Sequence, residues 1–185
     1  MKKEILALLV VVACWGSTLQ ANDWKNAPIS EVQKAAEQGN VDAQSLLGAM
    51  YANGEGVAQD YKQAVAWTRK AAEQGNVDAQ RLLGAMYFNG SGVAQDDKQA
   101  VAWFRKAAEQ GNVYAQYMLG AMYFHGRGVA QDYKLAYVWS SVSAANGHVE
   151  AATNRDLFAK RLSPAVLAEA QALAGQYVEL YQPKQ

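Results

Sequence analysis

Residues 40–75 read NVDAQSLLGAMYANGEGVAQDYKQAVAWTRKAAEQG, and this stretch returns twice further along the chain. Residues 76–111 match it at 31 of 36 positions, and residues 112–147 match the second copy at 21 of 36. A fixed period of about 20 to 50 residues is typical of stacked supersecondary units, none of which buries its apolar face alone. The sequence therefore predicts a repeat protein with three units of 36 residues.

Each unit carries the signals of two helices joined by a glycine-rich loop. Asn40 is a good N-cap, and apolar residues then recur at helical spacing until Gly54. Asp60 can cap a second helix, which the pattern extends to Gly75 at the position after the helix end. The loop contains Gly54 and Gly56, which can adopt the positive φ angles that a tight connection needs. Each unit is therefore predicted to be an antiparallel helix pair.

Two kinds of residue recur without change inside the predicted helices. One is glycine, at Gly48, Gly84 and Gly120. Because a glycine inside a helix costs about 1 kcal/mol relative to alanine, we expect a neighbouring helix to approach closely there. The other is tryptophan, at Trp67, Trp103 and Trp139. We interpret these tryptophans as core residues rather than as an aromatic ligand ladder.

Thirteen positions of the first unit recur in both later units or nearly so: Ala43, Leu47, Gly48, Tyr51, Gly54, Gly56, Val57, Asp60, Ala64, Trp67, Ala71, Ala72 and Gly75. This pattern resembles the Sel-one-like repeat (SLR) family, a relative of the tetratricopeptide repeats, over residues 40–147. The resemblance implies an all-α fold, a right-handed superhelical solenoid of antiparallel helix pairs that acts as an adaptor for other proteins. The cysteine pairs of one branch of that family are absent, so the activity of that branch is not carried over.

Segments outside the repeats are predicted to close the two ends of the stack. Residues 22–39 contain one helix, over 29–38, that ends in the same KAAEQG string as a repeat unit. Residues 148–185 contain a degenerate first helix and a last helix that begins at Pro164, a favourable first helical position. We expect the final residues, 182–185, to be frayed.

The first 21 residues have the order of a secretory signal peptide. Two lysines precede an apolar run over 5–13, which is too short to span a membrane, and a polar spacer then ends at Ala21. Cleavage after Ala21 would leave residues 22–185 as the mature chain. The alternative is lipid attachment at Cys14, because the residues before it resemble a bacterial lipoprotein box. The sequence thus predicts a periplasmic or secreted protein, or else a membrane-anchored lipoprotein, with no transmembrane span.

Composition excludes several classes of protein. The 17 basic and 17 acidic residues balance, so no positive field exists to hold nucleic acid. A single cysteine excludes a disulfide framework and a cysteine-ligated zinc site. His125 and His148 lack the spacing of a zinc hydrolase helix. We therefore predict that the chain is not an enzyme and has no catalytic residue, metal or cofactor.

Function is sought at the positions that change between otherwise copied units. On the first helix of each unit these positions share one face, offset from the core face, and the resemblance places that face on the concave side of the solenoid. Tyrosine and arginine are frequent binding anchors. We therefore predict that this face binds a partner protein or peptide of unknown identity through Arg81, Phe88, Tyr114, Tyr117, Phe124 and His125.

Two alternatives remain for the aromatic residues of the third unit. They could pack against the C-terminal capping helices, because the third unit borders them. They could also form an envelope glycan-binding site or part of a hydrolase. The first alternative predicts that truncating Phe124 lowers stability, whereas partner binding predicts that it weakens capture of the partner.

Overall fold

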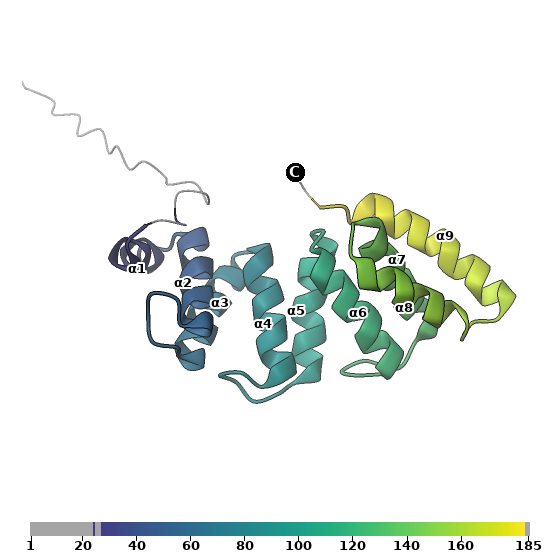
Figure 1. Cartoon of the computed structure of the whole chain (residues 1–185), viewed down its shortest axis with the longest axis horizontal. Coiled ribbons are helices and arrows are strands. Elements are labelled where there is room, and N and C mark those ends of the chain that lie inside the picture. Colours follow the sequence, from purple (N-terminus) through teal and green to yellow (C-terminus); the bar gives the residue numbers. More distant parts are fainter. Residues whose placement is uncertain (1–23, 25–26, 184–185) are drawn as a thin grey trace, which may run out of the picture.

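The computed structural model describes Trp24 and residues 27–183, and this part of the chain consists of α-helices without a strand. Figure 1 shows the helices stacked side by side along the long axis of the molecule. None of the described helices has the length and apolar character needed to cross a membrane. The helices are α1 (Ile29–Glu37), α2 (Val41–Asn53), α3 (Tyr61–Glu73), α4 (Val77–Asn89), α5 (Asp97–Glu109), α6 (Val113–His125), α7 (Tyr133–Ala145), α8 (Val149–Ala159) and α9 (Pro164–Leu180).

The repeat units form the helix pairs α2/α3, α4/α5 and α6/α7, whose members pack against each other. Successive pairs join through contacts of α3 with α4 and of α5 with α6. At one end α1 packs on α2, and at the other α8 and α9 pack on α7 (Figure 1). The prediction of an all-α solenoid of antiparallel helix pairs is confirmed.

The helix ends follow the capping signals of the sequence. The Asn40 side chain accepts a hydrogen bond from the backbone N–H of Ala43 at 2.9 Å, and Asp60 accepts from Lys62 and Gln63. Such caps satisfy backbone donors that have no partner inside the helix. The loop glycine at Gly54 takes the left-handed conformation, with φ of 74°. Equivalent caps recur in the later units, so each unit begins and ends its helices in the same way.

The interior glycines let the two helices of a unit approach closely, as predicted. A Cβ atom on Gly48 would overlap the hydroxyl oxygen of Thr68 and lie 2.9 Å from the Thr68 backbone nitrogen. At Gly84 a Cβ would lie 2.9 Å from the Phe104 ring. The partner residue on the second helix thus differs between units, while the glycine that accommodates it does not.

A row of buried glutamines connects each unit to the one before it. Gln44 donates to the Ala36 carbonyl at 3.0 Å, and Gln80 donates to the Ala72 carbonyl at 3.2 Å. Each side-chain carbonyl in turn accepts from an amide at the end of the same unit's second helix: Gln74 Nε2 at 2.7 Å and Gln110 Nε2 at 2.8 Å. Gln116 makes the corresponding bonds with Ala108 and Asn146. These bonds fix the spacing between units, because a buried amide without partners is costly.

The repeated tryptophans lie at or near the core. Trp103 and Trp139 are buried, as predicted, whereas Trp67 is half-buried at the edge of the first unit's core cluster. Each of the first two indoles carries a lysine ammonium over its ring, Lys70 Nζ at 3.9 Å from the Trp67 centroid and Lys106 Nζ at 4.1 Å from that of Trp103. The tryptophans stabilise the scaffold through burial, and each lysine covers the indole ring of its own helix.

The C-terminal segment departs from the prediction of a frayed tail. Gln182 and Pro183 lie against Gly111 in the turn between α5 and α6, so that prediction is wrong for these two residues. The backbone carbonyl of Tyr181 is held by two side-chain amides, which explains why the segment is ordered on the stack. The predicted signal peptide, its cleavage after Ala21 and the lipidation at Cys14 lie outside the described residues.

Replacement of Gly48 by alanine should lower the free energy of unfolding by about 1–3 kcal/mol, because the helices must separate to admit the methyl group. A Cβ on Gly175, within α9, would meet no atom within 4 Å, so Gly175→Ala should instead raise stability by up to about 1 kcal/mol. Urea unfolding followed by circular dichroism measures both changes. Equal effects at the two positions would contradict the close-packing role of Gly48.

Candidate functional site

An open hollow of about 380 Å³ lies between α2 and α4, on the face that the sequence predicts to bind. Asp42 and Ser45 on α2 face Asp78 and Arg81 on α4 across this hollow. Trp24, which is 5% exposed, also lines it and belongs to the first unit's core cluster. The remaining lining residues are Leu46, Ala49 and Asn76.

The polar groups of this hollow are held in place by the helix caps. Asn76 accepts from the Ala79 backbone through its side-chain oxygen at 2.9 Å, and its amide donates to Asp42 Oδ1 at 3.2 Å. The N-cap of α4 therefore positions a carboxylate that belongs to α2. Because Arg81 borders the same hollow, the site offers both signs of charge to a polar segment.

A row of neighbouring side chains continues from Arg81 through the third unit to the start of α8. The Arg81 guanidinium carbon lies 5.8 Å from the Tyr114 ring centroid, and the Tyr114 and Tyr117 rings lie 6.3 Å apart. Tyr117 stacks on His148 at 4.3 Å with an angle of 8° between the rings. Tyr114 is 42% exposed, so it is the aromatic member of this row that offers a ring to a partner.

The other predicted residues lie near the C-terminal ends of α4 and α6 and have different surroundings. Phe124 is half-buried and stacks on Phe158 of α8, with ring centroids 4.2 Å apart, and the edge of His125 lies 5.0 Å from it. Phe88 lies under the guanidinium of Arg127, 4.0 Å from the ring centroid. Phe124 therefore has the contact that packing against the C-terminal cap predicts.

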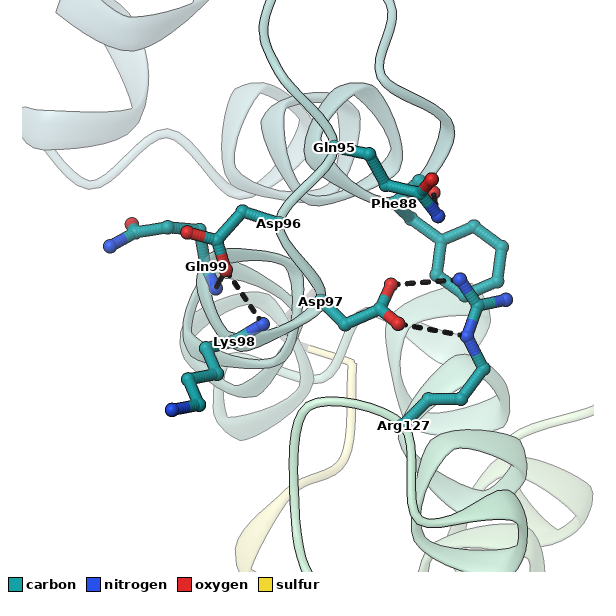
Figure 2. A network of polar contacts seen from close by, with 7 residues as sticks. All are labelled: Phe88, Gln95, Asp96, Asp97, Lys98, Gln99 and Arg127. Atoms are coloured by element: carbon teal, nitrogen blue, oxygen red, sulfur yellow. Dashed lines mark hydrogen bonds and ion pairs between the residues drawn. The ribbon is translucent and has the colours of Figure 1, made fainter.

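Arg127, whose guanidinium covers the Phe88 ring, also forms an ion pair with Asp97. Figure 2 shows its guanidinium donating to both carboxylate oxygens of Asp97, with Nε at 3.0 Å and Nη2 at 2.8 Å. Bidentate pairs of this kind have a fixed geometry, so Arg127 is held across the Phe88 ring. The loop of the third unit is thus fastened to the start of α5 in the second.

The position that Phe88 and Arg127 fill between the second and third units is open between the first and second units. There a hollow of about 210 Å³ lies between the first and second units, where Ala52 replaces Phe88 and Ser91 replaces Arg127. Its other lining residues are Asn53, Tyr61, Leu82, Ala85, Met86 and Asn89. The predicted residues therefore fall into groups with different surroundings. Arg81, Tyr114 and Tyr117 follow the α2–α4 hollow. Phe88 fills the junction of the second and third units, and Phe124 and His125 lie where the third unit meets α8.

Sequence reasoning missed Trp24 as a lining residue, and it missed the Arg127–Asp97 pair. It included the repeat position of Asp42 and Asp78 in the predicted face but chose only Tyr114, the third-unit residue, as an anchor. The two aspartates were not chosen because tyrosine is the more frequent binding anchor at that position of the repeat. The ion pair did leave a signal, because both Asp97 and Arg127 depart from their counterparts in the other units. Two departures that face each other at a unit junction are the pattern expected of a compensating pair.

The described residues offer little for acid–base or metal chemistry. Among them, no group of three histidine, cysteine or acidic residues could hold a metal ion. Burial raises the pKa of Tyr181, and a hydrogen bond from Lys134 lowers the pKa of the Glu169 carboxyl. Both groups belong to α9 or its end and lie away from the α2–α4 hollow. The geometry of the hollow suits recognition of a polar segment by charge and by an aromatic ring.

A solenoid of helix pairs with a variable surface on its first helices is a class of interaction scaffold. Comparison with protein families identifies it further: the Sel1 repeat profile matches residues 33–40, 41–76, 77–112 and 113–148. The chain belongs to the Sel1 repeat family, which confirms the resemblance seen in the sequence. Sel1 repeat proteins generally mediate protein–protein interactions. The match to 33–40 also places the end of α1 within the repeat pattern.

Solved structures that resemble the chain include the following two. One is a protective antigen present in uropathogenic Escherichia coli strains that displays an SLR fold, with 35% identity, a TM-score of 0.65 and coverage of 83% of this chain. This chain spans only 41% of that antigen. The other is a Sel1 repeat protein from Oxalobacter formigenes, with 40% identity, a TM-score of 0.63 and coverage of 69% of this chain and 96% of that one. A comparison with curated proteins found no match.

Truncation of Phe124 to alanine should lower the free energy of unfolding by about 2–3 kcal/mol, below the about 3–5 kcal/mol of a fully buried ring, because Phe124 is not fully buried. His125→Ala is the matched control: the exposed histidine should change stability by less than about 0.5 kcal/mol. Thermal and urea unfolding of the two variants measure this difference. A Phe124→Ala variant as stable as the control would argue against cap packing.

Proposed function

We propose that this chain is an exported interaction scaffold that binds a partner protein or peptide on the face formed by α2, α4 and α6. The observation that carries the proposal is the α2–α4 hollow, with the Arg81–Tyr114 contact at its border. Solvent-accessible arginine and tyrosine next to a hollow are typical of binding hot spots. The described residues contain no competing arrangement suited to catalysis, and the Sel1 fold is typically a non-catalytic scaffold.

Charge in the hollow defines the kind of segment that would fit. Asp42 and Asp78 would attract a basic side chain, and Arg81 would pair with a carboxylate or a backbone carbonyl. Tyr114 would then pack its exposed ring against an apolar or aromatic residue of the partner. The expected ligand is a peptide segment of mixed charge that crosses from α2 towards α6.

The predicted residues would contribute unequally. Arg81 and Tyr114 are the proposed anchors, and Tyr117 supports Tyr114 while it stacks on His148. Phe88 and Phe124 already have partners over one ring face, Arg127 and Phe158, so they would border the site and not fill it. His125 is exposed beside Phe124 and would make at most a peripheral contact.

The glycan-binding alternative requires free aromatic ring faces, because sugars stack on them. The covered faces of Phe88, Phe124 and Tyr117 argue against it. Quenching of tyrosine fluorescence by added oligosaccharides would favour a glycan ligand over a protein or peptide ligand.

Export is proposed from the first 21 residues, whose order of lysines, apolar run and small residue at Ala21 is that of a signal peptide. The similar structure from uropathogenic Escherichia coli is described as a protective antigen, which is compatible with exposure outside the cytoplasm. Expression in a Gram-negative host followed by intact mass measurement tests the proposal. We expect the mature chain to begin at Asn22. A mass with a diacyl or triacyl group on Cys14 would place the protein among the lipoproteins instead, and an unprocessed chain would contradict export.

Affinity capture from an extract of the cells that produce the protein, followed by titration of the recovered partner, tests the binding surface. Arg81→Ala and Tyr114→Ala should each weaken binding by about 1–3 kcal/mol, the usual cost of losing a hot spot. Stability should fall by less than about 1 kcal/mol, because both side chains retain contact with water.

Lys98→Ala is the control for this titration, since Lys98 is an exposed cation on α5, in a second helix. It should leave partner affinity unchanged. Unchanged affinity in the Arg81 and Tyr114 variants as well would remove the α2–α4–α6 face as the binding site.

A further inference from the structure

The end of the chain is bound to the solenoid like a peptide ligand. The Tyr181 carbonyl accepts hydrogen bonds from Gln116 Nε2 at 2.8 Å and Asn146 Nδ2 at 3.1 Å, and the Tyr181 ring stacks on Trp139 at 5.6 Å. The next two residues cross the turn between α5 and α6, where a Cβ on Gly111 would overlap the Gln182 carbonyl oxygen. Figure 1 shows the chain continuing beyond the end of α9 towards the tops of α5 and α6. Tyr181–Pro183 thus dock in three ways. The Tyr181 ring stacks on a tryptophan, the Tyr181 carbonyl accepts two hydrogen bonds, and the Gln182–Pro183 backbone passes over Gly111.

The groups that hold this segment recur in the two preceding units at a spacing of 36 residues. The glycine of the turn, the buried glutamine and the tryptophan are identical, and the amide of Asn146 is replaced by the amide of a glutamine. Glu109, whose charge adds to burial in raising the pKa of Tyr181, also recurs. The second-unit set is Glu73, Gly75, Gln80, Trp103 and Gln110, and the first-unit set is Glu37, Gly39, Gln44, Trp67 and Gln74.

The turn glycines of these two earlier sets are uncovered within the described chain. A Cβ on Gly75 or on Gly39 would meet no atom within 4 Å, whereas the equivalent position at Gly111 is filled by the tail. The space that the tail occupies in the third unit is therefore open in the first and second.

The buried glutamines have a donor to spare at the open positions. Gln116 donates to two carbonyls, those of Ala108 and Tyr181. Gln44 and Gln80 are 5% and 4% exposed, and within the described chain each donates to only one carbonyl, that of Ala36 or Ala72. A side-chain amide carries two N–H donors, so one donor of each is available for a further acceptor. A partner carbonyl would satisfy it, as the Tyr181 carbonyl does at Gln116.

The indole rings at the open positions are covered by groups that can move away. Lys70 and Lys106 are exposed, long side chains whose ammonium groups lie over Trp67 and Trp103. In the third unit the equivalent residue is Val142, and tyrosine rings of α9 and the tail lie against Trp139. An incoming aromatic ring can displace a surface lysine at small cost, because the ammonium regains water.

We infer that the first and second units each dock an extended segment of another protein, in the way that the third unit docks the chain's own Tyr181–Pro183. The segment would bring an aromatic residue to the tryptophan, accept a hydrogen bond from the glutamine through its carbonyl, and cross Gly75 or Gly39 in an extended conformation. The chain's own tail is already bound within the same molecule, so a different protein supplies the occupant.

The docking site at Gly75 is distinct from the α2–α4 hollow, but a segment bound there would extend towards that hollow. Pro183 and Asp78 line one small hollow beside Gly111, and Asp42, which is 36 positions before Asp78, lines the α2–α4 hollow. A segment that crosses Gly75 would therefore emerge next to Asp42. The inference does not depend on the role of Arg81 or Tyr114, because none of the docking groups is shared with them.

A labelled peptide of residues 177–185, YVELYQPKQ, is the probe, and fluorescence anisotropy with the purified chain is the measurement. We expect saturable binding to the wild type. The double variant Gly39→Asn and Gly75→Asn should weaken it about tenfold or more, because the new side chains block the crossing while asparagine tolerates a positive φ. A peptide with alanine in place of the tyrosine at position 181 should bind about tenfold more weakly than the unmodified peptide.

Gly147→Asn is the matched control. Gly147 has a similar φ of 101° and equally open surroundings, but no tryptophan and glutamine of a following unit accompany it. It should leave peptide binding unchanged, and circular dichroism should show the same helical content in all variants. Absence of saturable binding to the wild type, or the same loss in the Gly147 control, would overturn the inference. Dimerisation of the wild type that disappears on removal of residues 181–185 would overturn the assignment of the site to a different protein.

Discussion

The buried glutamine bonds between successive units are the constraint on which the rest of the structure depends. Each glutamine joins the end of the preceding unit's second helix to the end of its own, so the distance between units is set by hydrogen bonds inside the stack. Close helix approach at the interior glycines then sets the thickness of each unit. With both distances fixed, surface residues at equivalent positions face one another at regular intervals, and changes at these positions create hollows or fill them.

The two unit junctions differ in their surface while their backbones are alike. Ala52 and Ser91 leave a hollow between the first and second units, while Phe88 and Arg127 close the corresponding place one unit later. The backbone needs no alteration for either state, because the caps and loop glycines recur unchanged. A scaffold of this kind can vary its binding surface at a few positions, while its stability depends on the positions that are identical in all units.

The fold was predictable from the sequence to the level of individual caps, because Asn40, Asp60 and the interior glycines act locally and repeat three times. The candidate site was predictable only in part. The face was identified by the positions that vary, among them the one that carries Asp42, Asp78 and Tyr114, but Trp24 reaches the hollow from outside the repeats. The stacking of Phe124 on Phe158 and the return of the tail to Gly111 join residues far apart in sequence, which no periodic pattern contains.

The central claim is that a partner binds in the α2–α4 hollow, on the face formed by the first helices. A photo-crosslinking amino acid placed at Ser45, in the wall of the α2–α4 hollow, or at Lys98, on α5, tests it most directly in the cells that produce the protein. The account predicts a discrete covalent adduct from position 45 and none from position 98. Adducts of equal yield at both positions, or at position 98 alone, would contradict it.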